Sequence, residues 1–271
     1  MKRLAAGRPL VVLVLIACAI YLPRAVWPTS AFYVHVLTAD RLRVLGAFAK
    51  LVCLGLGAFF CFRSAARFGS GNPARAPWRS IGAWLASWTL GQLLLVVYAC
   101  HLLPEPPGVS AADAAFLAGF VPLFAGQIRF IFVYRASGFP IGSARQHLVI
   151  AALTAVTLAA LSWGLIARLA RSDAPIADRV VYVAYPVLDL AALVPTAVMM
   201  RIAFAFRPSK VWAVWAGLLA GFASIAVGDV VSAALSSGVE DTYNPWIHLT
   251  WLLGYLFMAW GAKLQDELLS A

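Results

Sequence analysis

The chain has 271 residues, of which 63% are hydrophobic and 12% are charged, and its formal net charge is +10. Soluble domains carry about 25% charged residues, so this composition excludes an ordinary soluble protein and indicates an integral membrane protein. The basic residues are dispersed along the chain and form no single patch, which argues against nucleic acid as a partner. Membrane lipids are the expected surroundings.

Apolar windows of the length that crosses a bilayer, about 17–25 residues, follow one another along the whole chain. They predict an all-α, polytopic membrane protein of one domain (residues 1–271) with eight transmembrane helices. The predicted spans are residues 9–27, 43–62, 79–103, 111–133, 147–167, 180–206, 211–235 and 245–263. The basic start resembles a signal peptide, but no cleavage site of small residues follows it, so the first window is expected to remain a transmembrane helix.

The charge distribution supports this count of spans. With the N-terminus in the cytoplasm, the inner loops and helix ends collect 14 of the 21 basic residues, and the outer loops hold seven of the 11 acidic residues. Because basic residues concentrate in cytoplasmic loops, we expect both termini to lie in the cytoplasm. The outer segment at residues 28–38 is interpreted either as an interfacial segment or as a plain linker.

A weak internal similarity suggests two parallel halves, about residues 1–135 and 136–271. WTLGQLLLVVYA (88–99) overlays IAVGDVVSAAL (225–235). The matched positions are Gly91 with Gly228, Gln92 with Asp229 and, at nearly the same offset, Lys50 with Asp189. Four helices per half would relate the halves by an axis along the membrane normal. Chance similarity between helices rich in leucine and alanine is the alternative interpretation.

Three charged residues lie well inside the predicted spans: Lys50, Asp189 and Asp229. An ionisable group at membrane depth costs about 2.5–3.5 kcal/mol on insertion scales, so each one needs a partner or a function. Counting about 1.5 Å per residue from the helix ends places all three at a similar depth in the outer half. Two interpretations stay open: a structural ion pair with Lys50 as the counter-ion, or a polar ligand-binding pocket.

Polar and aromatic residues near the same helix ends would form the rim of such a pocket. Tyr182, Tyr185 and Asp189 share one helical face because they lie at positions i, i+3 and i+7, and the last span repeats this spacing. The candidate ligand-binding residues are Asp189, Asp229, Lys50, Tyr185, Tyr182, Tyr98, His101, His248, Trp251 and Tyr255. Tyrosine and tryptophan near helix ends are also typical interface anchors. The chain has no P-loop, HExxH or GxSxG motif, so we predict no cofactor, metal or catalytic residue.

Four stretches together resemble the multi-helix membrane module at the N-terminus of bacterial GGDEF/EAL and PAS-containing signalling proteins. They are SAADAAFLAGFVPLF (110–124), AYPVLDL (184–190), VGDVVSAAL (227–235) and HLTWLLGYLFMAWG (248–261). The positions that match the family's pattern are Asp113, Tyr185, Pro186, Asp189, Gly228, Asp229, Trp251 and Tyr255. The resemblance implies a sensor module in a bacterial inner membrane. Such modules lead into a cytoplasmic output domain, and this chain ends at Ala271, so we expect a partner membrane or cytoplasmic signalling protein to carry the signal.

Three functions are compatible with these observations. The first is a sensor or scaffold subunit that binds a small or lipidic ligand, or a partner membrane protein, and has no catalytic output of its own. The second is an intramembrane lipid hydrolase, because eight-helix hydrolases of the lysoplasmalogenase type also rely on two membrane-embedded carboxylates, and a paired acid and base can activate water. The third is an ion-coupled transporter, in which parallel repeats also occur.

Overall fold

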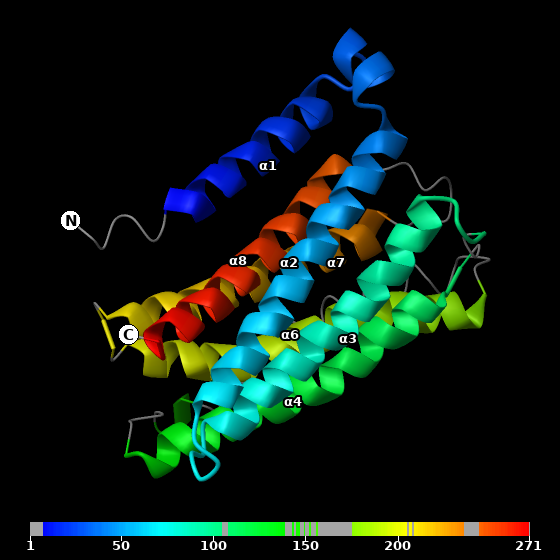
Figure 1. Cartoon of the computed structure of the whole chain (residues 1–271). Helices are drawn as coiled ribbons and strands as arrows, with labels where there is room; N and C mark the ends of the chain where they lie inside the picture. Colours follow the sequence, from blue (N-terminus) through cyan, green and yellow to red (C-terminus); the bar gives the residue numbers. More distant parts are fainter. Residues whose placement is uncertain are drawn as a thin grey trace.

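The computed structural model describes residues 8–104, 108–138, 143, 145–146, 149, 152, 156, 175–204, 206–207, 209–235 and 244–270. This part of the chain is helical and contains no strand, which confirms the all-α prediction there (Figure 1). The helices are α1 (Arg8–Val26), η2 (Phe32–Val36), α2 (Ala39–Arg67), α3 (Arg75–Ala99), α4 (Ala111–Ala136), α6 (Ile176–Phe204), α7 (Lys210–Leu235) and α8 (Pro245–Leu268). Six of them, α1, α2, α3, α4, α6 and α7, are long and apolar enough to cross a membrane. The predicted span at 147–167 lies almost wholly outside the described residues.

Six helices form a closed ring in the order α2, α3, α4, α6, α7 and α8, and α8 packs back against α2. The helix α1 lies outside this ring, against α8 (Figure 1). We call the end of the ring where α1 begins and α8 ends the terminal end, and the opposite end the distal end. Helix α4 finishes at the terminal end and α6 begins at the distal end (Figure 1), as the prediction of eight spans requires.

The order of helices around the ring is compatible with two parallel halves. The triplet α2, α3 and α4 is followed by α6, α7 and α8, and the contacts within one triplet recur within the other. The matched glycines lie at equivalent close contacts. A Cβ on Gly91 would lie 2.9 Å from Phe116 of α4, and a Cβ on Gly228 would lie 2.5 Å from Thr250 of α8. The duplication itself stays a prediction.

The helix α8 is central to the bundle, although it is not among the six helices that are long and apolar enough to cross a membrane. It contacts α1, α2 and α7. Its polar residues His248, Trp251 and Tyr255 face an internal cavity, and Tyr255 is buried. These inward residues lower the hydropathy of α8 without exposing polar groups on the outside of the bundle.

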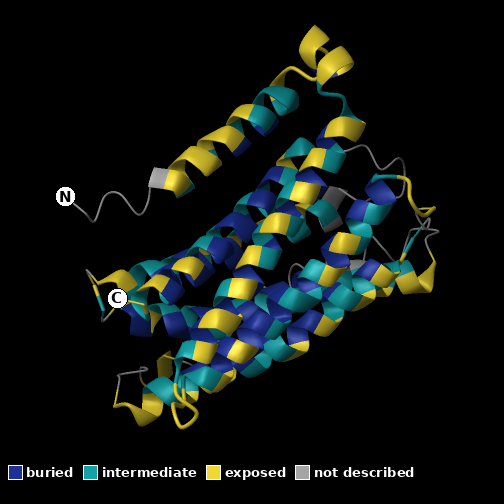
Figure 2. Cartoon of the chain, viewed as in Figure 1, coloured by how far each residue is buried: buried dark blue, intermediate teal, exposed yellow. Residues whose placement is uncertain are grey.

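The outer surface of the bundle is apolar, and its centre is rich in aromatic rings. Exposed residues run along the outward face of α1 and of the ring (Figure 2). Among them are the exposed apolar side chains Leu15, Phe59 and Phe132. At the centre, Trp84 stacks on Phe222 with ring centroids 4.8 Å apart. A continuous apolar exterior of this extent marks a surface that faces lipid or a partner rather than water.

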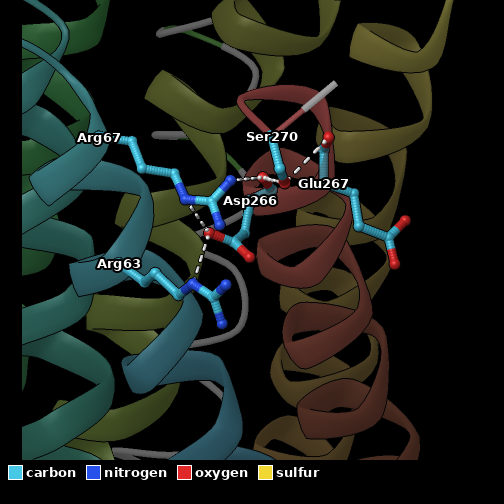
Figure 3. Close-up of polar contacts among 5 residues, drawn as sticks. All are labelled: Arg63, Arg67, Asp266, Glu267 and Ser270. Atoms are coloured by element: carbon cyan, nitrogen blue, oxygen red, sulfur yellow. Dashed lines mark hydrogen bonds and ion pairs between the residues drawn. The ribbon is translucent and has the colours of Figure 1, made fainter.

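A buried carboxylate joins α2 to α8 at the terminal end. Asp266, whose side chain is 7% exposed, lies 3.4 Å from Nε of Arg63 and 3.1 Å from Nε of Arg67 (Figure 3). Arg67 also donates to the main-chain carbonyl of Asp266 at 3.1 Å, and Ser270 Oγ donates to the same carbonyl at 2.6 Å. The sequence analysis counted the two arginines only among the basic residues of the inner loops and helix ends, whereas in the structure they connect the last turn of α8 to α2.

The segment at residues 28–38 folds into a turn rather than a plain linker. Residues Phe32–Val36 form one π-helical turn, η2. Tyr33 is buried there, and its hydroxyl donates to the carbonyl of Ile20 at 2.9 Å. The turn therefore packs back onto the end of α1, because a buried tyrosine hydroxyl needs an acceptor.

Candidate functional site

A cavity of about 240 Å³ lies in the distal half of the ring, and all six ring helices contribute to it. Its walls are lined by Lys50, Trp88, Gln92, Leu95, Asp113, Phe116, Val181, Tyr185, Pro186, Asp229, Ser232, His248, Trp251 and Tyr255. The lining combines two carboxyl groups, a lysine and a histidine with aromatic and aliphatic walls. Few polar groups converging in an otherwise apolar cavity are typical of ligand sites.

The first acidic group of the cavity is Asp229, near the end of α7. Its Oδ1 accepts a hydrogen bond from Nε1 of Trp251 at 2.6 Å. Its carboxyl group also lies beside that of Asp189, which is 1% exposed on α6. No hydrogen-bond donor in the described part of the chain reaches either oxygen of Asp189. Two neighbouring carboxyl groups, one of them without a donor, therefore lie at this wall of the cavity.

The second acidic group, Asp113, is held by both of its oxygens. Oδ2 accepts from the backbone N–H and from the hydroxyl of Ser110, both at 2.8 Å, and this closes a capping box at the start of α4. Oδ1 accepts from the hydroxyl of Tyr185 at 2.9 Å. A carboxylate in the first turn of a helix is stabilised by the helix dipole. The bond to Tyr185 therefore fixes α6 against the start of α4 at the cavity wall.

The basic side of the cavity is formed by Lys50 and His248. Lys50 is 4% exposed, and its Nζ lies 3.1 Å from Nδ1 of His248. The same Nζ lies 5.3 Å from the centre of the Trp251 ring. Among the described residues Lys50 makes no ion pair with Asp189 or Asp229, so the predicted role of Lys50 as their counter-ion is wrong. The reason is that the neighbours of Lys50 are His248 and the ring of Trp251, while Asp229 accepts from the indole nitrogen of Trp251.

The structure gathers most of the predicted site residues but not all of them. Those that line the cavity are Lys50, Tyr185, Asp229, His248, Trp251 and Tyr255. Asp189 lies behind this wall, against Asp229. Tyr98 is buried but does not line the cavity, and His101 is exposed beyond the end of α3 with a positive φ of 55°. Neither residue lines the cavity, and His101 lies beyond α3 because this helix already ends at Ala99. The side chain of Tyr182 lies outside the described residues.

The sequence analysis missed Gln92, Trp88 and Asp113 as cavity residues. Two of them carried a signal. Gln92 is the position that the internal similarity aligns with Asp229, and its Nε2 donates to the carbonyl of Ala47 at 3.2 Å. Asp113 lies in the stretch SAADAAFLAGFVPLF (110–124), which carries part of the family resemblance, although its place near a helix start suggested a loop charge. The sequence around Trp88 does not show whether this tryptophan lines a cavity or packs in the core.

The candidate site rests on this geometry. The cavity, the carboxyl contact and the Lys50–His248 contact come from residues that are far apart in the sequence and that the ring of helices brings together. Family models, curated proteins and solved structures were compared with the chain, and none of them matches it.

Proposed function

We propose that the protein is a bacterial inner-membrane sensor or scaffold subunit that binds a small or lipidic ligand in the distal cavity. In this proposal both termini lie in the cytoplasm, so the cavity opens in the outer half of the membrane. One observation carries the proposal: carboxyl groups, a lysine and aromatic rings from six helices converge on a cavity of about 240 Å³. Buried charges inside a helix bundle are costly, so their gathering at a cavity favours a function there.

The link between the cavity and the terminal end supports a sensor. Lys50 and His248 bring α2 and α8 together at the cavity, and the ion pairs of Asp266 bring the same two helices together at the other end (Figure 3). A ligand that changes the separation of α2 and α8 at the cavity would act on the terminal end through rigid helices. A partner signalling protein would read that change on the cytoplasmic side.

The carboxyl contact between Asp189 and Asp229 favours a second candidate, an intramembrane lipid hydrolase. One protonated and one ionised carboxyl group can serve as acid and base towards a water molecule. Asp229 lines the cavity and Asp189 does not, so both groups would not face the same water there. For this reason binding is the function that the geometry favours. Loss of ether or ester hydrolysis in Asp229→Asn, with the fold retained, would establish the hydrolase instead.

A cavity-filling substitution tests the proposed function. Leu95 of α3 lines the cavity, whereas Leu90 of the same helix is 54% exposed. We expect Leu95→Trp to remove the ligand because the larger ring occupies its place, while Leu90→Trp adds the same ring outside the bundle. The measurement is mass spectrometry. The protein is purified in lipid nanodiscs and released from them by mild activation, and the molecules that stay bound to it are identified.

The wild type and Leu90→Trp are expected to retain a common bound species that Leu95→Trp lacks. If all three proteins release the same set of molecules, the cavity is not a binding site and the proposal fails. Thermal melting of the three proteins shows whether Leu95→Trp is folded, so that a lost ligand is not confused with a lost structure.

A further inference from the structure

We infer that the cavity takes a zwitterion, a group with a protonated amine at one end and an anionic oxygen group at the other. This inference rests on the proposed binding function and names the chemistry of the ligand. It follows from the separation of the charged groups in the cavity into two poles. The acidic pole is Asp229 with Asp113, and the basic pole is Lys50 with His248.

The acidic pole is built to receive an ammonium group. Asp229 lines the cavity, and the carboxyl group of Asp189 lies behind it. Aromatic rings surround this pole: Trp88 lies edge-on to Tyr255 at 5.9 Å and to Phe116 at 5.8 Å between centroids. A cation is attracted both by carboxylates and by the faces of aromatic rings.

The basic pole has donors available for an anionic group. An ammonium group has three N–H donors, and the Lys50 ammonium uses one of them towards Nδ1 of His248. Within the described part of the chain no carboxylate reaches this lysine, although it is 4% exposed. A buried lysine of this kind pairs well with phosphate or carboxylate oxygens because charge-assisted hydrogen bonds are about twice as strong as neutral ones.

The indole of Trp251 contacts both poles. Its Nε1 donates to Asp229 at 2.6 Å, and its ring centre lies 5.3 Å from Nζ of Lys50. The protein's own charges therefore do not neutralise each other by direct contact. A simple cation would compensate only the acidic pole and a simple anion only the basic pole. A zwitterion that spans the indole compensates both poles, so that no buried charge is left without an opposite charge.

The test measures binding of four soluble probes to purified protein by tryptophan fluorescence, since Trp88 and Trp251 line the cavity. Dihexanoyl phosphatidylethanolamine carries both charges, dihexanoyl phosphatidylglycerol only the negative one, and hexylamine only the positive one. Glycerophosphoethanolamine carries both charges without acyl chains, so it separates a free zwitterion from a lipid head group. We expect the phosphatidylethanolamine to bind about tenfold or more tightly than either singly charged probe.

Charge-removing variants locate the binding. Lys50→Gln and Asp229→Asn are each expected to abolish the preference for the zwitterion, because each removes one pole. Their matched controls are Lys263→Gln and Asp40→Asn, which remove the same charges at exposed positions that do not line the cavity. The controls are expected to bind all probes as the wild type does. Leu95→Trp keeps every polar group of the cavity and is expected to bind none of the probes, so the inference does not depend on the folding of the charge variants.

Three outcomes overturn the inference: equal binding of the zwitterionic and singly charged probes, a preference that survives Lys50→Gln and Asp229→Asn, or no binding of either zwitterion. Binding of a singly charged probe that Leu95→Trp abolishes would overturn the zwitterion and leave the proposed binding function standing. Binding of glycerophosphoethanolamine as tightly as the lipid would assign a free zwitterion, and much weaker binding would assign a lipid head group.

Discussion

At the scale of single residues, the buried charges are distributed in a way that the sequence did not suggest. Lys50 contacts a histidine, whereas Asp189 and Asp229 lie beside each other. Trp251 contacts both charged groups of the cavity, and its substitution is therefore the most informative single change at this site.

The hydrogen bond from Trp251 to Asp229 can be tested against a matched tryptophan on the same helix. Nε1 of Trp260 is buried and has no acceptor among the described residues. Both Trp251→Phe and Trp260→Phe lose ring volume, but only the first leaves a carboxyl group without its donor. Hydrogen bonds to charged groups contribute about 1.5–3 kcal/mol, so we expect Trp251→Phe to be less stable than Trp260→Phe by that amount. Apparent melting temperatures in the same detergent measure the difference, and equal values would contradict this role of Trp251.

At the scale of helices, the close contact between α7 and α8 depends on small residues. A Cβ on Gly221 of α7 would lie 2.8 Å from the backbone oxygen of Gly254 and 2.5 Å from Met258. A Cβ on Gly254 would in turn lie 3.0 Å from the oxygen of Gly221. Small residues let helix backbones approach closely, which is how helices associate without a hydrophobic driving force. This contact holds α8, and with it three cavity residues, in place.

A pair of glycine substitutions tests this contact. Gly221→Ala is expected to lower stability by about 1–3 kcal/mol, because the added methyl group meets backbone atoms that cannot rotate away. Gly55→Ala is the control, since its Cβ would lie 3.9 Å from the nearest atom, a side-chain carbon of Thr89. Alanine also has a helix propensity about 1 kcal/mol better than glycine, so this control is expected to be neutral or stabilising. The change in melting temperature of each variant measures this effect, and a change of the same sign for both variants would contradict close packing at Gly221.

At the scale of the whole molecule, a ring of six helices encloses the cavity, and α1 packs on its outside against α8. The long described helices alternate in direction except for α4 and α6, which both run from the distal to the terminal end, and α1 begins at the end of the bundle where α8 finishes (Figure 1). The basic residues Arg63, Arg67 and Arg207 lie at this terminal end, which is the end expected to face the cytoplasm. Arg207 lies 4.0 Å from the ring of Trp212, an arrangement typical of residues at a membrane boundary.

Reporter fusions test this orientation. A fluorescent protein that matures only in the cytoplasm is expected to fluoresce when fused after Ser270, at the terminal end. Alkaline phosphatase, which is active only outside the cytoplasm, is expected to be active when fused after Gly108, in the distal connection before α4. The opposite pattern would invert the topology and place the cavity in the inner half of the membrane.

The sequence was informative where one physical property dominated a segment. The apolar windows located α1, α2, α3, α4, α6, α7 and α8, although α2, α3 and α6 begin four residues earlier than predicted because the helices continue past their apolar windows into charged ends. Spacing on one helical face correctly brought Trp251 and Tyr255 to the cavity, since residues at i, i+3 and i+7 of a helix point the same way. Counting residues from the helix ends placed Lys50, Asp189 and Asp229 at a similar depth, and this placement stays a prediction.

Which residues of different helices contact each other depended on the tertiary structure. Depth says how far along its axis a charge lies but not which way it faces around the ring, so the sequence paired Lys50 with an aspartate and overlooked His248 as its contact. It treated Arg67 as a loop charge, although Asp266 lies 199 residues later and only 3.1 Å away. The sequence by itself determined the helical character and apolar exterior of this protein, because both follow from local periodicity and composition. Only the packing of the ring decided which charges meet, because that depends on the rotation of each helix about its own axis.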